Sequence, residues 1–459
     1  MGLSICCKII RTLLKESSHE ISPKVGIIEN MKSLAQRIYT HPNFERVLGW
    51  GKLLTITGST QVLVQAIGFI SGIIIIRTLS THEYALYTLA NTTLGAMIIL
   101  ADGGISTGVM AQGGKVWQDH AELGKVLSTG SYLKKKFAIG SLLLAVPPLF
   151  FLFRHHGTSW GMSVLITLSL IPAFYTTLSN QLLEIAPKLR QDILPLQKVQ
   201  LGANVGRVVI LGLTLFAFPW AFIALIAYGL PQVWGNMHIR RSSKKYADHA
   251  QKPDPAVRKE ILFIVKRKLP EAIYYCIGGQ ITIWLLSIFG STTEIAQIGG
   301  LGRLAVVINS LSVLFGTLIL PRFARLPNEP KVILLRFFQI QVGLVLLNIC
   351  LVFSFWIFST ELLWILGPDY AGLSTELLLN TVAACLSVVS GASFFLCLGR
   401  GWIINPLISI PLNVMAIICG ALIFDVSSLK GILMMNIFIA AVQVIMNSSY
   451  SYMKILKSK

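Results

Sequence analysis

The chain has 459 residues, of which 54% are apolar and only 13% charged, and its net charge is +19. Soluble domains carry about 25% charged residues, so this composition excludes an ordinary soluble multidomain protein. It predicts an all-α polytopic membrane protein, because a helix needs about 20 apolar residues to cross a bilayer. About twelve spans are predicted, at residues 55–76, 84–111, 137–153, 160–186, 196–217, 219–237, 270–289, 294–319, 338–358, 373–398, 403–424 and 430–452.

The basic residues are distributed unevenly between the two sides of these spans. Lys and Arg number 34 in the two tails and the loops on the same side, and 3 in the loops on the other side. This distribution excludes a basic nucleic-acid-binding patch on a soluble domain, and by the positive-inside rule it predicts that both termini are cytoplasmic. The two remaining basic residues, Arg207 and Arg303, lie inside predicted spans.

Residues 1–53 are predicted to form a cytoplasmic N-terminal segment. Between Lys8 and Lys15 the apolar residues share one helical face with basic residues around it, which favours an interfacial helix within residues 1–50. The alternative is a dispensable tail, with Met31 as the true translation start. The seven cysteines do not predict a disulfide framework, because five of them lie in apolar segments and are expected to be core residues.

A short motif occurs twice, as THEYALY at residues 81–87 and as TTEIAQI at residues 292–298. The alignment pairs Glu83 with Glu294, and each copy follows the first span of a six-span group. Chance similarity over seven residues is the alternative to an internal repeat. Parallel repeats of this kind build many transporters, with the substrate path between the halves. The predicted domains are an N-lobe at 54–237, a basic cytoplasmic linker at 238–268, a C-lobe at 269–453 and a cytoplasmic tail at 454–459.

Polar residues at membrane depth are candidate site residues, because burying them is costly. Arg303 is predicted near the membrane midplane, and the adjacent Gly299 and Gly300 are expected to leave room for a bulky group. Arg207 continues a helical stripe of polar residues that suggests a wet cavity wall. That stripe begins with Gln197, Gln200 and Asn204, and a matching stripe of the first span contains Gln61 and Gln65 beside glycines. Close helix packing is the alternative for the first span.

Two central arginines suggest an anionic substrate, because a guanidinium stays charged and binds phosphate oxygens bidentately. The alternative is a structural ion pair, for example between Arg303 and Asp102. A basic run could attract an anionic head group to the cytoplasmic mouth, although such runs are more often topology anchors. This run consists of Lys266, Arg267 and Lys268, and the carboxylates to test for ion coupling are Asp102, Glu184 and Glu271.

The sequence contains no P-loop, no metal-spaced His or Cys cluster and no large loop on the side opposite the termini. No catalytic residue, cofactor or metal site is therefore predicted, and the chain is not expected to be an enzyme. A membrane polymerase or ligase would need a sizeable outer loop with basic and His residues.

Three stretches resemble the Wzx-type O-antigen flippases of the multidrug/oligosaccharidyl-lipid/polysaccharide (MOP) superfamily. They are GFISGIIIIRTLSTHEYALYTLANTTLGAMIILADGGIST at 68–107, EIAQIGGLGRLAVVINSLSVLFGTLILPRFARL at 294–326, and ELLWILGPDYAGLSTELLL at 361–379 with LCLGRG at 396–401. The sequence departs from the family pattern after Leu79, where Ser80 and Thr81 replace the usual Gly-Pro, and at Ala85, which replaces a usual Gly.

The resemblance implies a MATE-like fold with two six-helix lobes around a central cavity. It also implies a flippase that moves undecaprenyl-pyrophosphate-linked oligosaccharide across the bacterial inner membrane by alternating access. Arg303 falls on the family's common arginine position, and Arg207 matches less closely. The implied partners are the lipid-linked oligosaccharide, membrane lipids, and glycan polymerase and chain-length regulator proteins, with no nucleic acid.

Two other functions stay open at this point. A multidrug or cation antiporter of the same superfamily would favour a deep carboxylate, which the first span lacks. A non-transporting scaffold for glycan assembly is the second alternative. The sequence does not reveal the sugar structure, the driving ion or the oligomeric state.

Overall fold

The computed structural model describes residues 42–457, except 321–322, 324–325, 328, 401 and 403. The expectations for an interfacial helix before residue 42 and for a start at Met31 lie outside this range. The chain divides into two compact units, residues 1–61 and residues 62–459. Every regular element in the described range is helical, as the composition predicts.

The first half of the chain contains six long helices. They are α3 (Pro42–Thr78), α4 (Thr81–Asp102), α6 (His120–His155), α7 (Trp160–Leu183), α9 (Leu194–Thr214) and α10 (Ala221–Lys244). Two short helices follow α4 and α7, namely α5 (Ile105–Gly113) and α8 (Ile185–Leu189). The predicted span 84–111 is thus broken in two, because Gly103 and Gly104 adopt positive φ angles of 48° and 92° that end α4.

The second half also contains six long helices. They are α11 (Pro255–Phe289), α12 (Thr292–Leu318), α14 (Pro330–Ile357), α16 (Ser374–Gly399), α17 (Pro406–Ile423) and α18 (Leu429–Lys457). The short elements α15 (Ser359–Leu366) and η1 (Pro368–Tyr370) lie between α14 and α16. Because α10 extends to Lys244 and α11 begins at Pro255, the two halves are connected by a non-helical segment of residues 245–254.

The helices are long enough to make this a multi-pass membrane protein. Within the described residues, nine are apolar and long enough to cross a membrane. The other three long helices, α9, α10 and α12, have 21, 24 and 27 residues. Together they give the twelve helices in two groups of six that the hydropathy pattern predicts. Several helices extend well beyond the predicted spans, because hydropathy marks only the apolar part of a helix.

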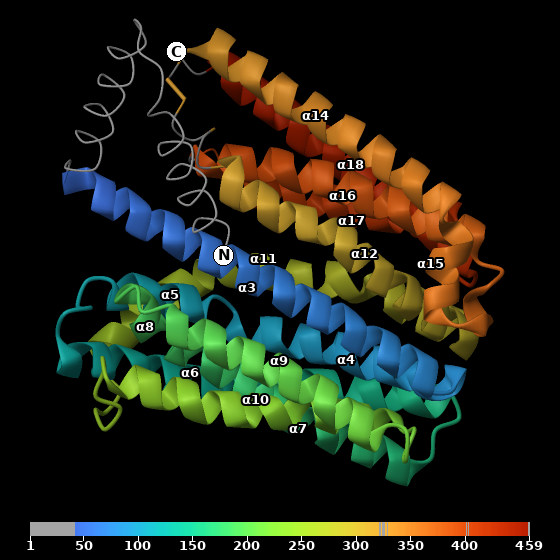
Figure 1. The fold of residues 1–459 in the computed structure, drawn as a ribbon, viewed down its shortest axis with the longest axis horizontal. Helices are drawn as coiled ribbons and strands as arrows, with labels where there is room; N and C mark the ends of the chain where they lie inside the picture. The colour runs from blue at the N-terminus through green and yellow to red at the C-terminus, as the bar shows by residue number, and fades with distance from the viewer. Residues whose placement is uncertain are drawn as a thin grey trace, which may run out of the picture. The chain divides into compact units, whose positions relative to one another are not determined.

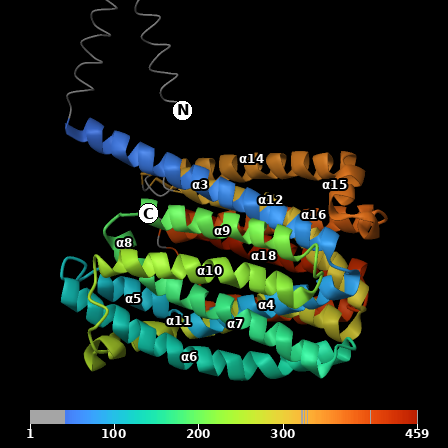
Figure 2. The ribbon, with the colours of Figure 1, turned by 60° about the horizontal axis from the view of Figure 1, so that its bottom comes forward.

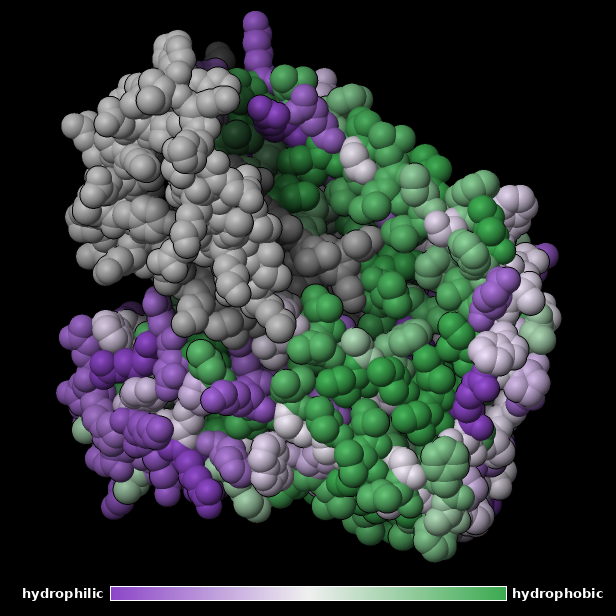
Figure 3. Space-filling view, viewed as in Figure 1, coloured by the Kyte–Doolittle hydropathy of each residue, from purple (hydrophilic) through white to green (hydrophobic). Residues whose placement is uncertain are grey.

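Within residues 62–459, the long helices run side by side with their axes roughly aligned (Figures 1 and 2). In the first half α7 packs against α10, and α4 against α6; in the second half α16 packs against α18 and α12. The two halves meet where α4 contacts α11 and α12, and where α5 contacts α11. Apolar side chains cover the sides of these helices, and hydrophilic side chains gather over α5, α8 and the neighbouring helix ends (Figure 3).

The two copies of the repeated motif have equivalent roles. Glu83 of α4 is buried, and its Oε2 accepts a hydrogen bond of 2.7 Å from the backbone N–H of Ala221, the first residue of α10. Glu294 of α12 accepts a hydrogen bond of 3.2 Å from the backbone N–H of Leu429, the first residue of α18. In each half, the second long helix therefore caps the sixth. Each glutamate thus supplies an acceptor to a helix-start N–H group that has none within its own helix.

Candidate substrate site

Arg303 lies at the contact between the two halves. Its Nη2 donates a hydrogen bond of 3.3 Å to the hydroxyl of Tyr87, and its guanidinium carbon is 5.8 Å from the centre of that ring. The stem of Arg303 passes close to α3, where a Cβ at Gly72 would lie 3.0 Å from Arg303 Cδ. Three helices, α3, α4 and α12, thus position this guanidinium.

Arg207 approaches the same tyrosine from α9. Its guanidinium carbon is 4.7 Å from the ring centre of Tyr228 on α10, a cation–π distance. Both Arg207 and Arg303 interact electrostatically with the Tyr87 hydroxyl. The two arginines, far apart in sequence, therefore converge on one side chain.

The two guanidiniums carry charge that the neighbouring protein does not balance. The four ion pairs between described residues include neither Arg207 nor Arg303. In the same range, the buried Nε of Arg207 has no hydrogen-bond partner. A buried donor without an acceptor is costly, so an acceptor supplied by a ligand would stabilise this site.

The glycines before Arg303 do not leave the space that the sequence suggested. A Cβ at Gly299 would lie 2.5 Å from Thr88 Oγ1, and a Cβ at Gly300 would lie 2.5 Å from the Tyr370 ring. Tyr370 in turn donates a hydrogen bond of 3.3 Å to the backbone carbonyl of Ala296. These glycines permit close packing of α12 against α4 and η1, and the expectation of room for a bulky group there is wrong.

The glutamines and the asparagine predicted to line the cavity wall differ in their exposure. Gln200 is exposed, and Asn204 donates its side-chain N–H to the Gln200 carbonyl of its own helix at 2.8 Å. Gln65 is half-buried on α3, whereas Gln197 is buried on α9. Gln61 is half-buried at the end of the first unit. A binding role for these residues stays a prediction.

Each carboxylate considered for ion coupling lies in a lysine ion pair. Asp102 is 2.8 Å from the buried Nζ of Lys134, and it also accepts hydrogen bonds from the Ser106 N–H and hydroxyl. The alternative pairing of Arg303 with Asp102 is therefore wrong. Glu184 pairs with Lys188 at 2.7 Å, and Glu271 pairs with Lys268 at 3.1 Å.

The predicted basic run on α11 is exposed throughout. Arg267 stacks on the Phe263 ring of its own helix at 4.2 Å, and Lys268 is partly neutralised by Glu271. Lys266 is exposed as well. Attraction of anions by this run stays a prediction.

The halves are also connected at the end of the helices where α4 and α12 begin. We call it the predicted outer end, because the sequence predicts that it lies on the side of the membrane opposite the termini. Arg77 donates a hydrogen bond of 2.8 Å to the Ile365 carbonyl and one to the Trp364 carbonyl, and it stacks on the Trp364 ring. Thr81 donates a hydrogen bond of 2.7 Å to Asp369.

His156, in the loop between α6 and α7, makes a third connection at this end. Its ring nitrogens lie 2.9 Å from Ser287 Oγ and 3.1 Å from Thr292 Oγ1. Burial, together with the neighbouring His155, lowers the pKa of His156 below its usual value. The contact is therefore made by a neutral imidazole at neutral pH.

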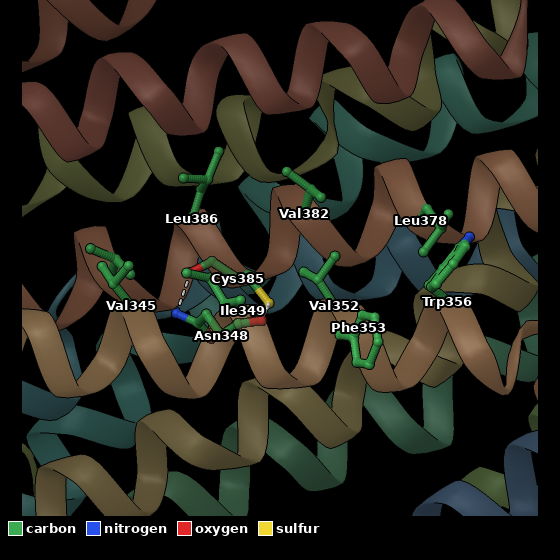
Figure 4. Close-up of a pocket in the computed structure, with 11 residues that line it drawn as sticks. Val345, Asn348, Ile349, Val352, Phe353, Trp356, Leu378, Val382, Cys385 and Leu386 are labelled. Atoms are coloured by element: carbon green, nitrogen blue, oxygen red, sulfur yellow. Dashed lines mark hydrogen bonds between the residues drawn. The ribbon is translucent and has the colours of Figure 1, made fainter.

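Two sizeable cavities lie in the second half, and neither contains a predicted site residue. The larger, about 600 Å³, lies between α14 and α16 and is almost entirely apolar (Figure 4). Its one amide, Asn348, donates a hydrogen bond to the Cys385 carbonyl at 3.3 Å. This cavity lacks the charge needed for an anion site. The second, about 310 Å³, is polar and lies between α11, α16, α17 and α18.

Sequence reasoning missed the tyrosines that surround the arginines and the burial of Lys134. Tyr84, Tyr87 and Tyr370 lie in the stretches that resemble flippases, and this resemblance was the sequence signal that could have identified them. The sequence predicted Lys134 in a cytoplasmic loop, but α6 begins at His120 and buries it against Gln181, whose Oε1 accepts its hydrogen bond at 2.6 Å.

No family model matches this sequence, and no curated protein matches it. Among solved structures, an inward-facing multidrug-resistance MATE transporter of the MOP superfamily is similar with a TM-score of 0.70 and 14% identity, covering 85% of this chain and 94% of that one. The lipid II flippase MurJ in an inward closed conformation is similar with a TM-score of 0.68 and 13% identity, covering 88% of each chain. The eukaryotic MATE transporter AtDTX14 gives 0.58 at 12% identity over 89% of this chain and 99% of that one. The chain therefore has the fold of MOP-superfamily transporters and flippases.

Proposed function

We propose that this protein is a flippase for a polyprenyl-pyrophosphate-linked oligosaccharide, moving the polar head group between membrane leaflets by alternating access. The observation that carries the proposal is the convergence of Arg303 and Arg207 on Tyr87, with no carboxylate partner for either arginine among the residues that the structure describes. Two guanidiniums suit a pyrophosphate, because each binds phosphate oxygens through parallel N–H donors. Two observations support a lipid-linked glycan as the substrate class: the structural similarity to a lipid II flippase and the sequence resemblance to Wzx-type proteins.

Translocation breaks no bond, so the proposal requires no catalytic group. Arg303 belongs to the second half and Arg207 to the first, so a pyrophosphate bound to both would be held between the halves. The exposed Lys266 and Arg267 are proposed to attract the anionic head group from the cytoplasmic side of a bacterial inner membrane. Gln61, Gln65, Gln200 and Asn204 are proposed to form hydrogen bonds with the sugars.

A multidrug antiporter is the second candidate, since MATE transporters share the fold. Two unbalanced guanidiniums would repel a cationic drug, and the three carboxylates considered above already have lysine partners. The charge of the site therefore favours an anionic substrate over a cationic one.

Binding measurements on the purified full-length protein test this choice. Native mass spectrometry would compare polyprenyl-pyrophosphate oligosaccharide with a lipophilic cationic dye. We expect Arg303→Ala and Arg207→Ala each to weaken lipid binding by about 10- to 100-fold, because a hydrogen bond to a charged group contributes about 1.5–3 kcal/mol. Arg336→Ala, at an exposed arginine of α14, is the matched control. Preferential dye binding, or unchanged lipid binding by both variants, would contradict the proposal.

A further inference from the structure

The polar cavity of the second half has a lining that differs from both the arginine cluster and the apolar cavity. Its volume is about 310 Å³, at the low end of the range for ligand pockets, so it suits a small ligand such as a sugar unit. Its polar side chains come from three helices and include no charged residue. They are Tyr274 and Thr282 of α11, Asn380 and Ser387 of α16, and Asn436 and Gln443 of α18.

Several of these polar groups have hydrogen-bonding capacity left over. Thr282 donates to Asn436 Oδ1 at 2.9 Å, and Asn380 donates its amide N–H to the Leu301 carbonyl at 3.0 Å. In the described part of the chain, the Asn436 amide nitrogen, the Asn380 amide oxygen and the Gln443 amide make no further hydrogen bond. Donors and acceptors are thus both available in one cavity.

We infer that this cavity binds an uncharged, hydroxyl-rich group, one neutral sugar unit of the lipid-linked substrate; the inference rests on the proposed function. A hydroxyl both donates and accepts, which matches a lining of amides and hydroxyls. A metal ion would require carboxylate ligands, and an anion would require Lys or Arg, neither of which lines the cavity. An apolar ligand would leave the amides unpaired, at a cost for each.

The cavity is structurally linked to the arginine site. Asn380 lines the cavity, and the Leu301 carbonyl that it contacts precedes Arg303 by two residues on α12. The helix that carries Arg303 therefore contacts one residue of the cavity wall, although α12 does not itself line the cavity. A pyrophosphate at Arg303 and a sugar in the cavity would be two parts of the same head group. The phosphates would be recognised by charge and the sugar by hydrogen bonds to uncharged side chains.

Gly279 of α11 provides a direct test, because it lines the cavity and a Cβ there would meet no atom within 4 Å. Gly279→Leu places an apolar side chain at the cavity wall, beginning from a Cβ position that meets no protein atom within 4 Å. Gly343→Leu on α14 is the matched control, since a Cβ at Gly343 also meets open space but does not line the cavity. Gln443→Leu is a second variant of similar volume that removes the free amide.

The measurement compares two probes by native mass spectrometry of the full-length protein: polyprenyl pyrophosphate without sugar, and the same lipid carrying a neutral disaccharide. We expect the wild type to bind the glycosylated lipid about tenfold more tightly than the bare lipid. Gly279→Leu and Gln443→Leu should reduce that preference to nearly one without weakening bare-lipid binding, and Gly343→Leu should keep it.

The outcomes separate this inference from the proposed function. Wild-type binding of both lipids with no preference, or a preference that survives both cavity variants, would overturn the sugar site and leave the flippase proposal standing. Loss of bare-lipid binding in Arg303→Ala but not in Gly279→Leu, together with loss of the preference for glycosylated lipid in Gly279→Leu, supports both. Binding of neither lipid by the wild type would overturn the proposed function and this inference with it.

Discussion

Arg303 of α12 donates a hydrogen bond to the Tyr87 hydroxyl of α4, and the contact joins the two halves of the chain at the proposed anion site. Arg207 also interacts with Tyr87 but belongs to the same half, so a movement of the second half against the first would change the Arg303 contact and leave the Arg207 contact in place. Under the proposed function, a substrate that binds Arg303 would compete with this contact between the halves.

The two repeated glutamates are each predicted to contribute to stability, independently of one another. Glu83→Ala and Glu294→Ala each leave a helix-start N–H without its acceptor, at Ala221 and Leu429 respectively. We expect each substitution to lower the free energy of unfolding by about 1–3 kcal/mol. The double variant should show additive losses, as expected for separate sites. Unfolding in detergent, followed by circular dichroism, measures this, and the absence of any loss in both single variants would contradict the equivalence of the halves.

The Asp102–Lys134 pair is predicted to be structural. Removing one partner with Lys134→Met leaves an unpaired carboxylate, which typically costs about 3–5 kcal/mol. Replacing both residues, as in Lys134→Met with Asp102→Leu, should recover much of that loss. Thermal unfolding of the three proteins in detergent tests the expectation. A double variant that transports normally would exclude Asp102 from ion coupling, whereas loss of ion-gradient dependence with normal stability would assign it that role.

Contacts at the predicted outer end should hold the halves together in this conformation. Thr81 and Asp369 are hydrogen-bonded at 2.7 Å, so cysteines at both positions should react with a short bifunctional thiol reagent. We expect crosslinking to stop transport in a protein whose native cysteines are replaced, and a cleavable reagent to restore it after reduction. The two single-cysteine proteins are the controls. Full transport by the crosslinked protein would mean that this end does not open.

His156 is predicted to make stability depend on pH. Burial lowers its folded-state pKa below the value of about 6.5 expected for the unfolded chain. The unfolded state therefore binds more protons below pH of about 6.5, and stability falls as the pH decreases through that window. His249, whose pKa burial also lowers, acts in the same direction. Thermal unfolding between pH 8 and pH 5 should show a weaker dependence in His156→Gln than in the wild type, with His238→Gln, a histidine that does not influence His156, as the control. An unchanged slope in His156→Gln would contradict this assignment.

The helices could be predicted largely from sequence, because apolar length is a local property. The predicted spans 294–319 and 373–398 differ from α12 and α16 by one or two residues at each end. Helix extensions into water were missed, as in α6, because polar residues outside the membrane form helices without an apolar signal. The adjacent glycines Gly103 and Gly104 are a sequence signal for a break after Asp102. Their positive φ angles, which end α4, could not be predicted from the sequence.

The candidate site was only partly predictable. Charge at membrane depth identified Arg303 and Arg207 without any knowledge of contacts. Their common partner Tyr87 was missed because it is 216 residues from Arg303, and no local pattern encodes a contact over that separation. The same reason explains the wrong expectation for Gly300, whose neighbour Tyr370 comes from η1. Spacing along one helix indicates which residues share a face, but not what packs against that face.

Translocation in proteoliposomes tests the central claim most directly. Polyprenyl-pyrophosphate oligosaccharide would be incorporated with wild-type protein, Arg303→Ala, Arg303→Lys or Arg336→Ala, and the glycan reaching the opposite leaflet measured by its accessibility to an added glycosidase. We predict translocation by wild type and Arg336→Ala, a rate at least about tenfold lower in Arg303→Lys, and a larger loss in Arg303→Ala, because lysine keeps the charge but not the bidentate geometry. Wild-type rates in a well-folded Arg303→Ala protein, or no translocation by the wild type, would contradict the account.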